Sequence, residues 1–139
     1  MFTMTSEYRG DLRTISMHLA SGNQVITDAP TDNQGKGEAF SPTDLLCTSL
    51  CSCMMTLMGI TANREGIDIS GITAEIEKVM AINPRRVRKV RITFSHPGLQ
   101  ISREQEKLLI EAAKTCPVAL SVSENLEQEI NFNWTLTVR

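Results

Sequence analysis

One stretch, residues 41–66, reads "SPTDLLCTSLCSCMMTLMGITANREG" and holds the clearest structural signals in the chain. It opens with helix-start signals: Ser41 as the N-cap, Pro42 at the first helical position, and Asp44 at the third, where its carboxylate can reach back to the cap. It closes on Gly66, a residue typical of helix ends. We therefore predict a long helix that starts at Pro42 and ends just before Gly66.

This predicted helix carries no charged side chain over 19 residues, from Leu45 to Asn63. That length is compatible with a membrane span. Several polar or small residues make a span unfavourable, and the patterned segments on both sides need a core to pack against. We expect a buried central helix rather than a membrane anchor. The residues that disfavour a span are Thr48, Ser49, Ser52, Thr56, Gly59 and Thr61.

Length and composition suit a single domain over residues 1–139. The chain has 41% hydrophobic residues and a formal net charge of -2, so no electrostatic attraction to nucleic acid or anionic membranes is expected. The N-terminus lacks the apolar region of a signal peptide, and we expect a cytoplasmic protein. In that reducing compartment, cysteines serve catalysis, metal binding or packing more often than permanent disulfides.

The segments around the helix alternate as β-strands do. Residues 8–20 and 24–30 are β-rich runs separated by "SGN", which predicts a hairpin. Residues 71–82 and 85–96 predict a second antiparallel pair, and the basic run "RRVRKVR" within it predicts a solvated face rather than an anion-binding patch. The expected inward side chains of this pair are Ile72, Ala74, Ile76, Val90, Ile92 and Phe94.

The C-terminal third predicts two helices and a strand. Residues 101–116 open with a capping pattern from Ser102 to Gln105, and Pro117 ends this helix and starts a short one. The helix carries an apolar stripe of Leu108, Leu109, Ala112, Ala113 and Cys116. The final segment alternates apolar residues at Ile130, Phe132, Trp134, Leu136 and Val138.

This order of elements predicts an α+β fold with antiparallel sheets around a buried central helix. A helix that is apolar on nearly every side needs cover on both flanks, and one small sheet covers only one of them. We therefore expect a homodimer in which a second subunit supplies the remaining cover.

Three of the four cysteines lie on the central helix, where each residue turns the helix by about 100°. Cys47 and Cys51 share one face, and Cys53 lies roughly 120° away from Cys47. Sulfurs so placed do not meet with disulfide geometry, so an intrachain bridge would join one of them to Cys116. They do not converge on a zinc ion either, and no metal or other cofactor is expected.

Packing is the expected role of Cys47 and Cys51, because free cysteine behaves as a small buried hydrophobe. Cys53 and Cys116 are candidates for reactivity, and the residue patterns alone do not decide which thiol attacks. Cys53 lies too deep in its helix for dipole activation and needs a cation, for which the N-terminal strand offers Arg9 and Arg13. Cys116 precedes a helix start, whose dipole is expected to lower its pKa.

Two motifs in this order resemble the OsmC/Ohr family, the osmotically inducible protein C and organic hydroperoxide resistance proteins. They are "SPTDLLCTSLCSCMMTL" and the later "AAKTCPVALSVS", with "YRGDLRT" and "ITDAP" as weaker matches upstream. The resemblance covers nearly the whole chain and implies an intertwined homodimer with the reactive cysteine on a buried central helix. It also implies that Cys53 attacks an organic hydroperoxide and leaves a sulfenic acid, and that Cys116 resolves this acid to a disulfide. A dithiol reductant, such as a dihydrolipoyl protein, would then recycle the enzyme.

The chain departs from the hydroperoxidase branch of the family at one position. That branch resembles this chain but has a glutamate directly after the helix-start proline, where it pairs with the arginine that activates the cysteine; here the residue is Thr43. Asp44 is the nearby acid, with a catalytic and a capping role both open. Arg13 matches the arginine position best, with Arg9 as the alternative. Two functions follow: a thiol-dependent peroxidase, or a non-catalytic dimer that binds a small ligand or responds to oxidation.

Overall fold

The central helix α1 spans Pro42–Glu65, as predicted. The structure, a computed structural model, describes residues 1–137, so the predicted place of Val138 in the last strand lies outside the described residues. Gly66 follows the helix with φ of +66°, in the left-handed region that favours glycine. One face of α1 is buried, and its residues are Cys47, Leu50, Cys51, Met54, Met58 and Ala62.

Two compact units make up the chain, one from Met1 to Leu46 and the other from Cys47 onward, so their boundary falls within α1. Each unit contains one three-stranded sheet. A single domain would require the two units to share one packed core, so that expectation stays a prediction. By length and composition α1 is apolar enough to cross a membrane, a test that the core helix of a globular domain also passes.

The N-terminal unit is an antiparallel sheet with the order β1-β2-β3. The strands are β1 (Met4–Gly10), β2 (Arg13–His18) and β3 (Gln24–Asp28), and the short 3-10 helix η1 (Thr31–Asn33) follows. The predicted hairpin around "SGN" is confirmed as the β2–β3 pair. The first predicted run was wrong as a single strand, because Gly10, Asp11 and Leu12 all have positive φ and turn the chain between β1 and β2.

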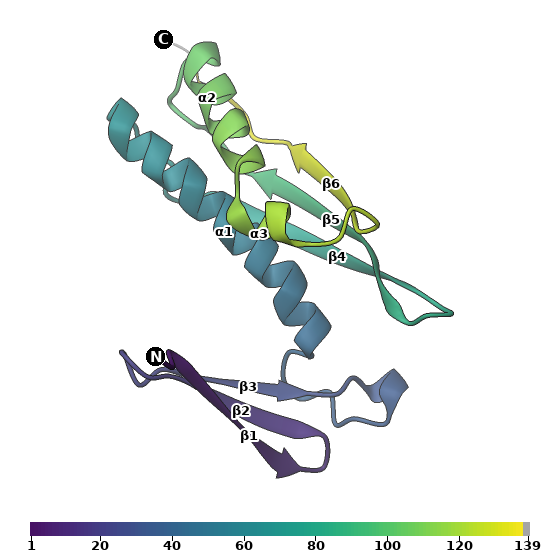
Figure 1. Cartoon of the computed structure of the whole chain (residues 1–139). Coiled ribbons are helices and arrows are strands. Elements are labelled where there is room, and N and C mark those ends of the chain that lie inside the picture. The colour runs from purple at the N-terminus through teal and green to yellow at the C-terminus, as the bar shows by residue number, and fades with distance from the viewer. Residues whose placement is uncertain (138–139) are drawn as a thin grey trace. The chain divides into compact units, whose positions relative to one another are not determined.

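The second unit contains the sheet β4-β5-β6, formed by Thr73–Ala81, Arg86–Ser95 and Glu127–Phe132 (Figure 1). β4 and β5 are antiparallel, as predicted. β5 and β6 are parallel, so the prediction of purely antiparallel sheets was wrong. The reason is the connection: α2 and α3 carry the chain back between β5 and β6, so that β6 enters the sheet in the same direction as β5.

The helices of this unit are α2 (Arg103–Lys114) and the short α3 (Pro117–Ser121). The predicted capping box is confirmed, since Ser102 and Gln105 each bond the backbone of the other. Leu109, Ala113 and Cys116 form the buried stripe. Leu108 was wrongly included in it and is 41% exposed, because it lies about 100° around the helix from Leu109.

One core joins α1, α2 and the sheet of this unit. Val90, Ile92 and Phe94 of the central strand β5 are fully buried, as predicted. Ile76 is 37% exposed, contrary to prediction, because β4 is an edge strand of the sheet. The alternating C-terminal residues Ile130, Phe132, Trp134 and Leu136 belong to the core or pack against it, and the rings of Phe94 and Phe132 stack at 5.5 Å.

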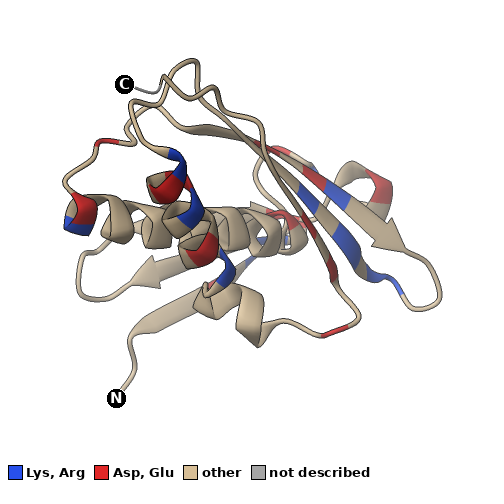
Figure 2. Ribbon diagram, turned by 90° about the horizontal axis from the view of Figure 1, so that it is seen from above, with Lys and Arg blue, Asp and Glu red and all other residues tan. Residues whose placement is uncertain are grey.

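Charged residues lie along the strands of the same sheet (Figure 2), and on β5 they alternate with the buried ones. Arg91 of β5 pairs with Glu77 of β4 and with Glu129 of β6, the latter at 2.5 Å. Lys89 pairs with Glu127 at 3.4 Å and Glu129 at 3.0 Å. These cross-strand pairs neutralise part of the basic run "RRVRKVR", which agrees with its prediction as a solvated face.

Candidate active site

Cys53 and Cys116 come together within the second unit. Cys53 is partly exposed on α1, and Cys116 is completely buried at the N-terminal end of α3. The two side chains are close enough for a hydrogen bond between their thiols, and this bond raises the pKa of Cys116. The structure thus brings together the two thiols that the sequence singled out as reactive candidates. All four cysteines are free thiols.

The pKa of Cys116 is raised, first by burial and then by the hydrogen bond with Cys53. The expectation of a lowered pKa was wrong. The backbone N–H groups of Ala119 and Val118 do favour the thiolate, but burial of the sulfur outweighs them. Cys116 is therefore a thiol that stays protonated more readily than an ordinary cysteine.

Cys47 and Cys51 lie on the core face of α1, with 2% and 4% of their surface exposed. This confirms that they share a buried face. Burial also raises the pKa of Cys51, which disfavours the reactive thiolate form. Their surroundings suit packing rather than chemistry.

In the N-terminal unit, Arg13 makes a two-pronged ion pair with Asp28 of β3. Its Nε donates to Asp28 Oδ1 at 2.7 Å and its Nη2 to Oδ2 at 2.8 Å. Glu38 adds a carboxylate at 3.2 Å from the same Nη2, and its backbone N–H donates to Asp28. Arg9, the alternative arginine, lies exposed and pairs with Glu7.

Asp28 was not among the predicted site residues. Only 1% of its surface is exposed, and the hydrogen bond from Arg13 holds its pKa below the ordinary value. A buried carboxylate needs such a partner, since burial alone would penalise its charge. The available signal was an acidic residue at the end of an apolar strand, followed by Ala-Pro, but the sequence did not show which cation would meet it.

Asp44 caps the start of α1. Its Oδ2 accepts a hydrogen bond from the backbone N–H of Ser41 at 2.9 Å, while the Ser41 hydroxyl accepts one from the N–H of Asp44 at 3.0 Å. This reciprocal pair is the capping arrangement that the sequence predicted. Thr43 also bonds to this cap, with its hydroxyl 3.1 Å from that of Ser41.

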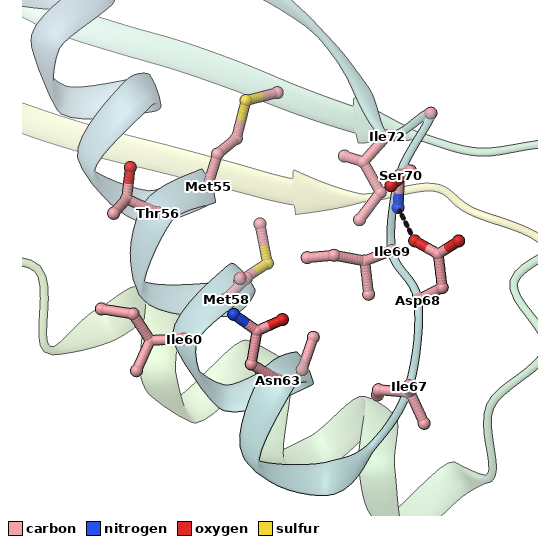
Figure 3. Close-up of a pocket in the computed structure, with 13 residues that line it drawn as sticks. Met55, Thr56, Met58, Ile60, Asn63, Ile67, Asp68, Ile69, Ser70 and Ile72 are labelled. Carbon is pink, nitrogen blue, oxygen red and sulfur yellow. Dashed lines mark hydrogen bonds between the residues drawn. The ribbon is translucent and has the colours of Figure 1, made fainter.

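A cavity of about 510 Å³ lies along the C-terminal half of α1 (Figure 3). Met55, Met58 and Ile69 give it apolar walls, and Asp68 and Ser70 stand at its polar side, where the Ser70 N–H donates to Asp68 at 2.8 Å. Its size suits a small organic ligand. Among residues 1–137, no group of three or more His, Cys, Asp or Glu side chains is arranged to hold a metal ion.

Comparison with known proteins identifies the family. The pattern of the OsmC-like protein family matches residues 35–131 of this chain, well over half of it. The chain belongs to the OsmC-like family. A solved structure from Psychrobacter arcticus 273-4, provisionally named an osmotic stress induced and detoxification response protein, is 52% identical. That likeness has a TM-score of 0.90 and covers 95% of this chain and 96% of the other.

More distant OsmC-like structures share the fold alone. An OsmC-like protein from Mycoplasma pneumoniae is 17% identical with a TM-score of 0.79, over 97% of each chain. An organic hydroperoxide resistance protein OsmC from Legionella pneumophila is 15% identical with a TM-score of 0.68, over 96% of this chain and 98% of that one. An uncharacterized protein of Methanocaldococcus jannaschii is 29% identical over 69% of this chain, which spans only 53% of that curated relative.

Proposed function

We propose that this OsmC-like protein is a thiol-dependent peroxidase that reduces organic hydroperoxides to alcohols. The observation that carries the proposal is the contact between a partly exposed thiol, Cys53, and a buried one, Cys116. A peroxidase of this kind needs one sulfur that the substrate can reach and a second that waits beside it. The names of the Psychrobacter and Legionella proteins, which refer to detoxification and hydroperoxide resistance, support the same chemistry.

In the first step, the Cys53 thiolate attacks one oxygen of the hydroperoxide. The O–O bond breaks and Cys53 becomes a sulfenic acid, while the departing alkoxide takes up the proton that the Cys53 thiol released and leaves as the alcohol. In the second step, Cys116 attacks the sulfenic sulfur, the S–O bond breaks, and water leaves as the disulfide forms. A dithiol reductant, such as a dihydrolipoyl protein, then supplies the two electrons that restore both thiols.

The roles of the two cysteines follow from their surroundings. Cys116 is completely buried and its raised pKa keeps it protonated, so it is poorly suited to meet the substrate first. The same properties suit a resolving thiol, which must survive until a sulfenic acid forms next to it. Cys53 is left as the thiol that attacks.

Arg13 is proposed as the cation that favours the Cys53 thiolate, on the strength of the family resemblance. Asp28 and Glu38 hydrogen-bond its guanidinium and hold that side chain in one conformation within the N-terminal unit. Asp44 is proposed to support the site by fixing the start of α1 rather than by touching the substrate. The Arg13→Lys variant keeps the charge but loses the two-pronged geometry, and should oxidise at Cys53 more slowly.

We also propose that the protein is a cytoplasmic homodimer. The outer face of α1 exposes apolar side chains, including Leu46 at 36% and Ile60 at 49%, which a second subunit would cover. Sedimentation at several protein concentrations tests this part, and a species with the mass of one chain at every concentration would contradict it.

The decisive experiment mixes the reduced protein with a small excess of cumene hydroperoxide and follows oxidation by intact mass and peptide mapping. We expect rapid loss of two hydrogens, mapped to a link between Cys53 and Cys116, and faster oxidation than with hydrogen peroxide. Cys53→Ser should abolish the reaction. Cys116→Ser should still form the sulfenic acid but no disulfide.

Cys51→Ser is the matched control, because it changes a thiol two residues from Cys53 that faces the core. It should oxidise like the unaltered protein. If Cys51→Ser remained folded but lost as much oxidation as Cys53→Ser, the attacking thiol would be misassigned. Slow and scattered oxidation of the unaltered protein would reject the peroxidase.

A second candidate is a non-catalytic protein of the same fold that binds a small ligand or responds slowly to oxidation. Thr43 in place of the family glutamate favours it, as does the cavity of about 510 Å³ beside α1. Slow oxidation together with saturable binding of an apolar small molecule would support this candidate over the first.

A further inference from the structure

The short helix α3 begins on a redox-active sulfur. Cys116 is its N-cap, and the sulfur accepts a hydrogen bond from the Ala119 N–H at 3.4 Å. The Cys116 carbonyl accepts another from the Leu120 N–H at 3.2 Å. Because α3 has five residues and starts with a proline, which lacks an N–H, few bonds hold it. The sulfur therefore accepts one of the few hydrogen bonds at the start of this helix.

Core packing of Val118 and Ala119 and two side-chain hydrogen bonds also hold α3. The Gln128 side chain donates to the Ala119 carbonyl at 3.1 Å, and the Ser121 hydroxyl donates to the Pro117 carbonyl at 2.7 Å. A cavity of about 280 Å³ adjoins Ala119 and Gln128. The helix thus has space beside it into which it can shift.

The same sulfur also faces α1. Its Sγ lies 4.0 Å from the carbonyl oxygen of Leu50, toward which the S–H donates, and the Cys53 thiol is its other hydrogen-bonding neighbour. Cys116 Sγ is therefore shared between two elements: it accepts from α3 and donates toward α1.

We propose that the redox state of Cys116 controls the order of α3. As a thiol, Cys116 caps this helix, and as part of a disulfide it no longer does. This inference rests on the Cys53–Cys116 disulfide of the proposed function. A disulfide requires the two sulfurs to approach to about 2.05 Å, much closer than hydrogen-bonded thiols. Sγ is thereby drawn toward α1 and away from the Ala119 N–H, and its proton is no longer present to bond Leu50.

Loosening of α3 would give a dithiol reductant access to the disulfide. In the thiol form Cys116 is completely buried, so a reductant cannot approach its sulfur. In the disulfide form, loosening of Pro117–Ser121 uncovers the sulfur pair for an incoming dithiol and frees the surface around Leu120, which is already 76% exposed. The reductant would therefore meet a different surface on the oxidised protein from that on the reduced one.

Hydrogen exchange of the Ala119 and Leu120 amides tests this coupling. The disulfide is made with diamide, an azo oxidant that takes one hydrogen from each thiol, so the test does not depend on peroxide chemistry. Loss of a helix cap should speed exchange of these amides about fivefold or more. Equal exchange in the thiol and disulfide forms, each verified by mass, would overturn the inference.

Three variants separate the cap from the disulfide. Cys116→Ser keeps an oxygen cap and cannot form the link, so its exchange should be slow with or without diamide. Cys53→Ser keeps the sulfur cap and should also stay slow. Cys116→Ala has no cap and should exchange fast even when reduced; if it matched Cys116→Ser, the capping role would be rejected. Fast exchange with diamide but no reaction with cumene hydroperoxide would retain this inference and reject the peroxidase.

Discussion

Replacement of Asp44 by alanine separates a capping role from a catalytic one. The change removes the acceptor, 2.9 Å away, for the backbone N–H of Ser41, a residue with only 2% of its surface exposed. An unsatisfied buried N–H costs about 1–3 kcal/mol, and loss of the carboxylate from the first turn of α1 adds about 0.3–1 kcal/mol. We therefore expect a loss of about 1.3–4 kcal/mol in the free energy of unfolding.

This loss converts to a melting temperature. Unfolding entropy is about 2.1 cal/mol/K per residue, or about 0.3 kcal/mol/K for a chain of this length, so Asp44→Ala should lower Tm by about 4–13 °C. Asp44→Asn is the matched control: its side-chain oxygen keeps the hydrogen bond and loses only the charge, so Tm should fall by about 1–3 °C. Both values can be read from calorimetry of the reduced protein.

The oxidation rate of Cys53 decides between the two roles. Measured with cumene hydroperoxide well below Tm, it should change by less than about twofold in Asp44→Ala, because fixing the start of α1 does not require contact with the substrate. An unchanged Tm together with a tenfold or larger loss of rate would refute the capping argument. It would place Asp44 in the catalytic machinery instead.

Three further predictions concern the two ion-pair sites and the core. The pKa of Asp28 is lowered by Arg13, so its stabilising effect is present above the ordinary carboxyl pKa and is lost as pH falls through the folded value. Asp28→Asn should flatten acid unfolding curves below the ordinary carboxyl pKa of 3.8, and unchanged curves would contradict this. The hydrogen bond from Arg91 and further pairing lower the pKa of Glu129 to about 2, so Glu129→Gln should remove the stability otherwise lost between about pH 4.3 and pH 2, and added salt should weaken the effect. Leu109→Ala, at a fully buried position, should cost about 2–5 kcal/mol in urea unfolding, and a loss below 1 kcal/mol would show that its surroundings collapse into the cavity.

Features that depend on residues close together in the chain could be predicted from the sequence, and features that depend on distant residues could not. Both capping boxes were predicted correctly, because the groups that bond in them lie within three residues of each other. The turn that splits the first β-rich run was missed, since Asp11 and Leu12 adopt left-handed conformations that few residues other than glycine favour. The parallel direction of β6 was also missed, because the pattern of a strand is the same in either direction.

Three features could be predicted without the structure: the bounds of α1, the shared face of Cys47 and Cys51, and the family to which the chain belongs. These features depend on helix periodicity, on caps and on motifs that are continuous in the chain. Two other features emerge from the folded chain alone: Cys53 lies beside Cys116, and Arg13 is bound by Asp28. Each pair joins residues from separate elements, and their contact follows from strand register and helix packing, where the surrounding side chains determine which groups meet and which of them are buried.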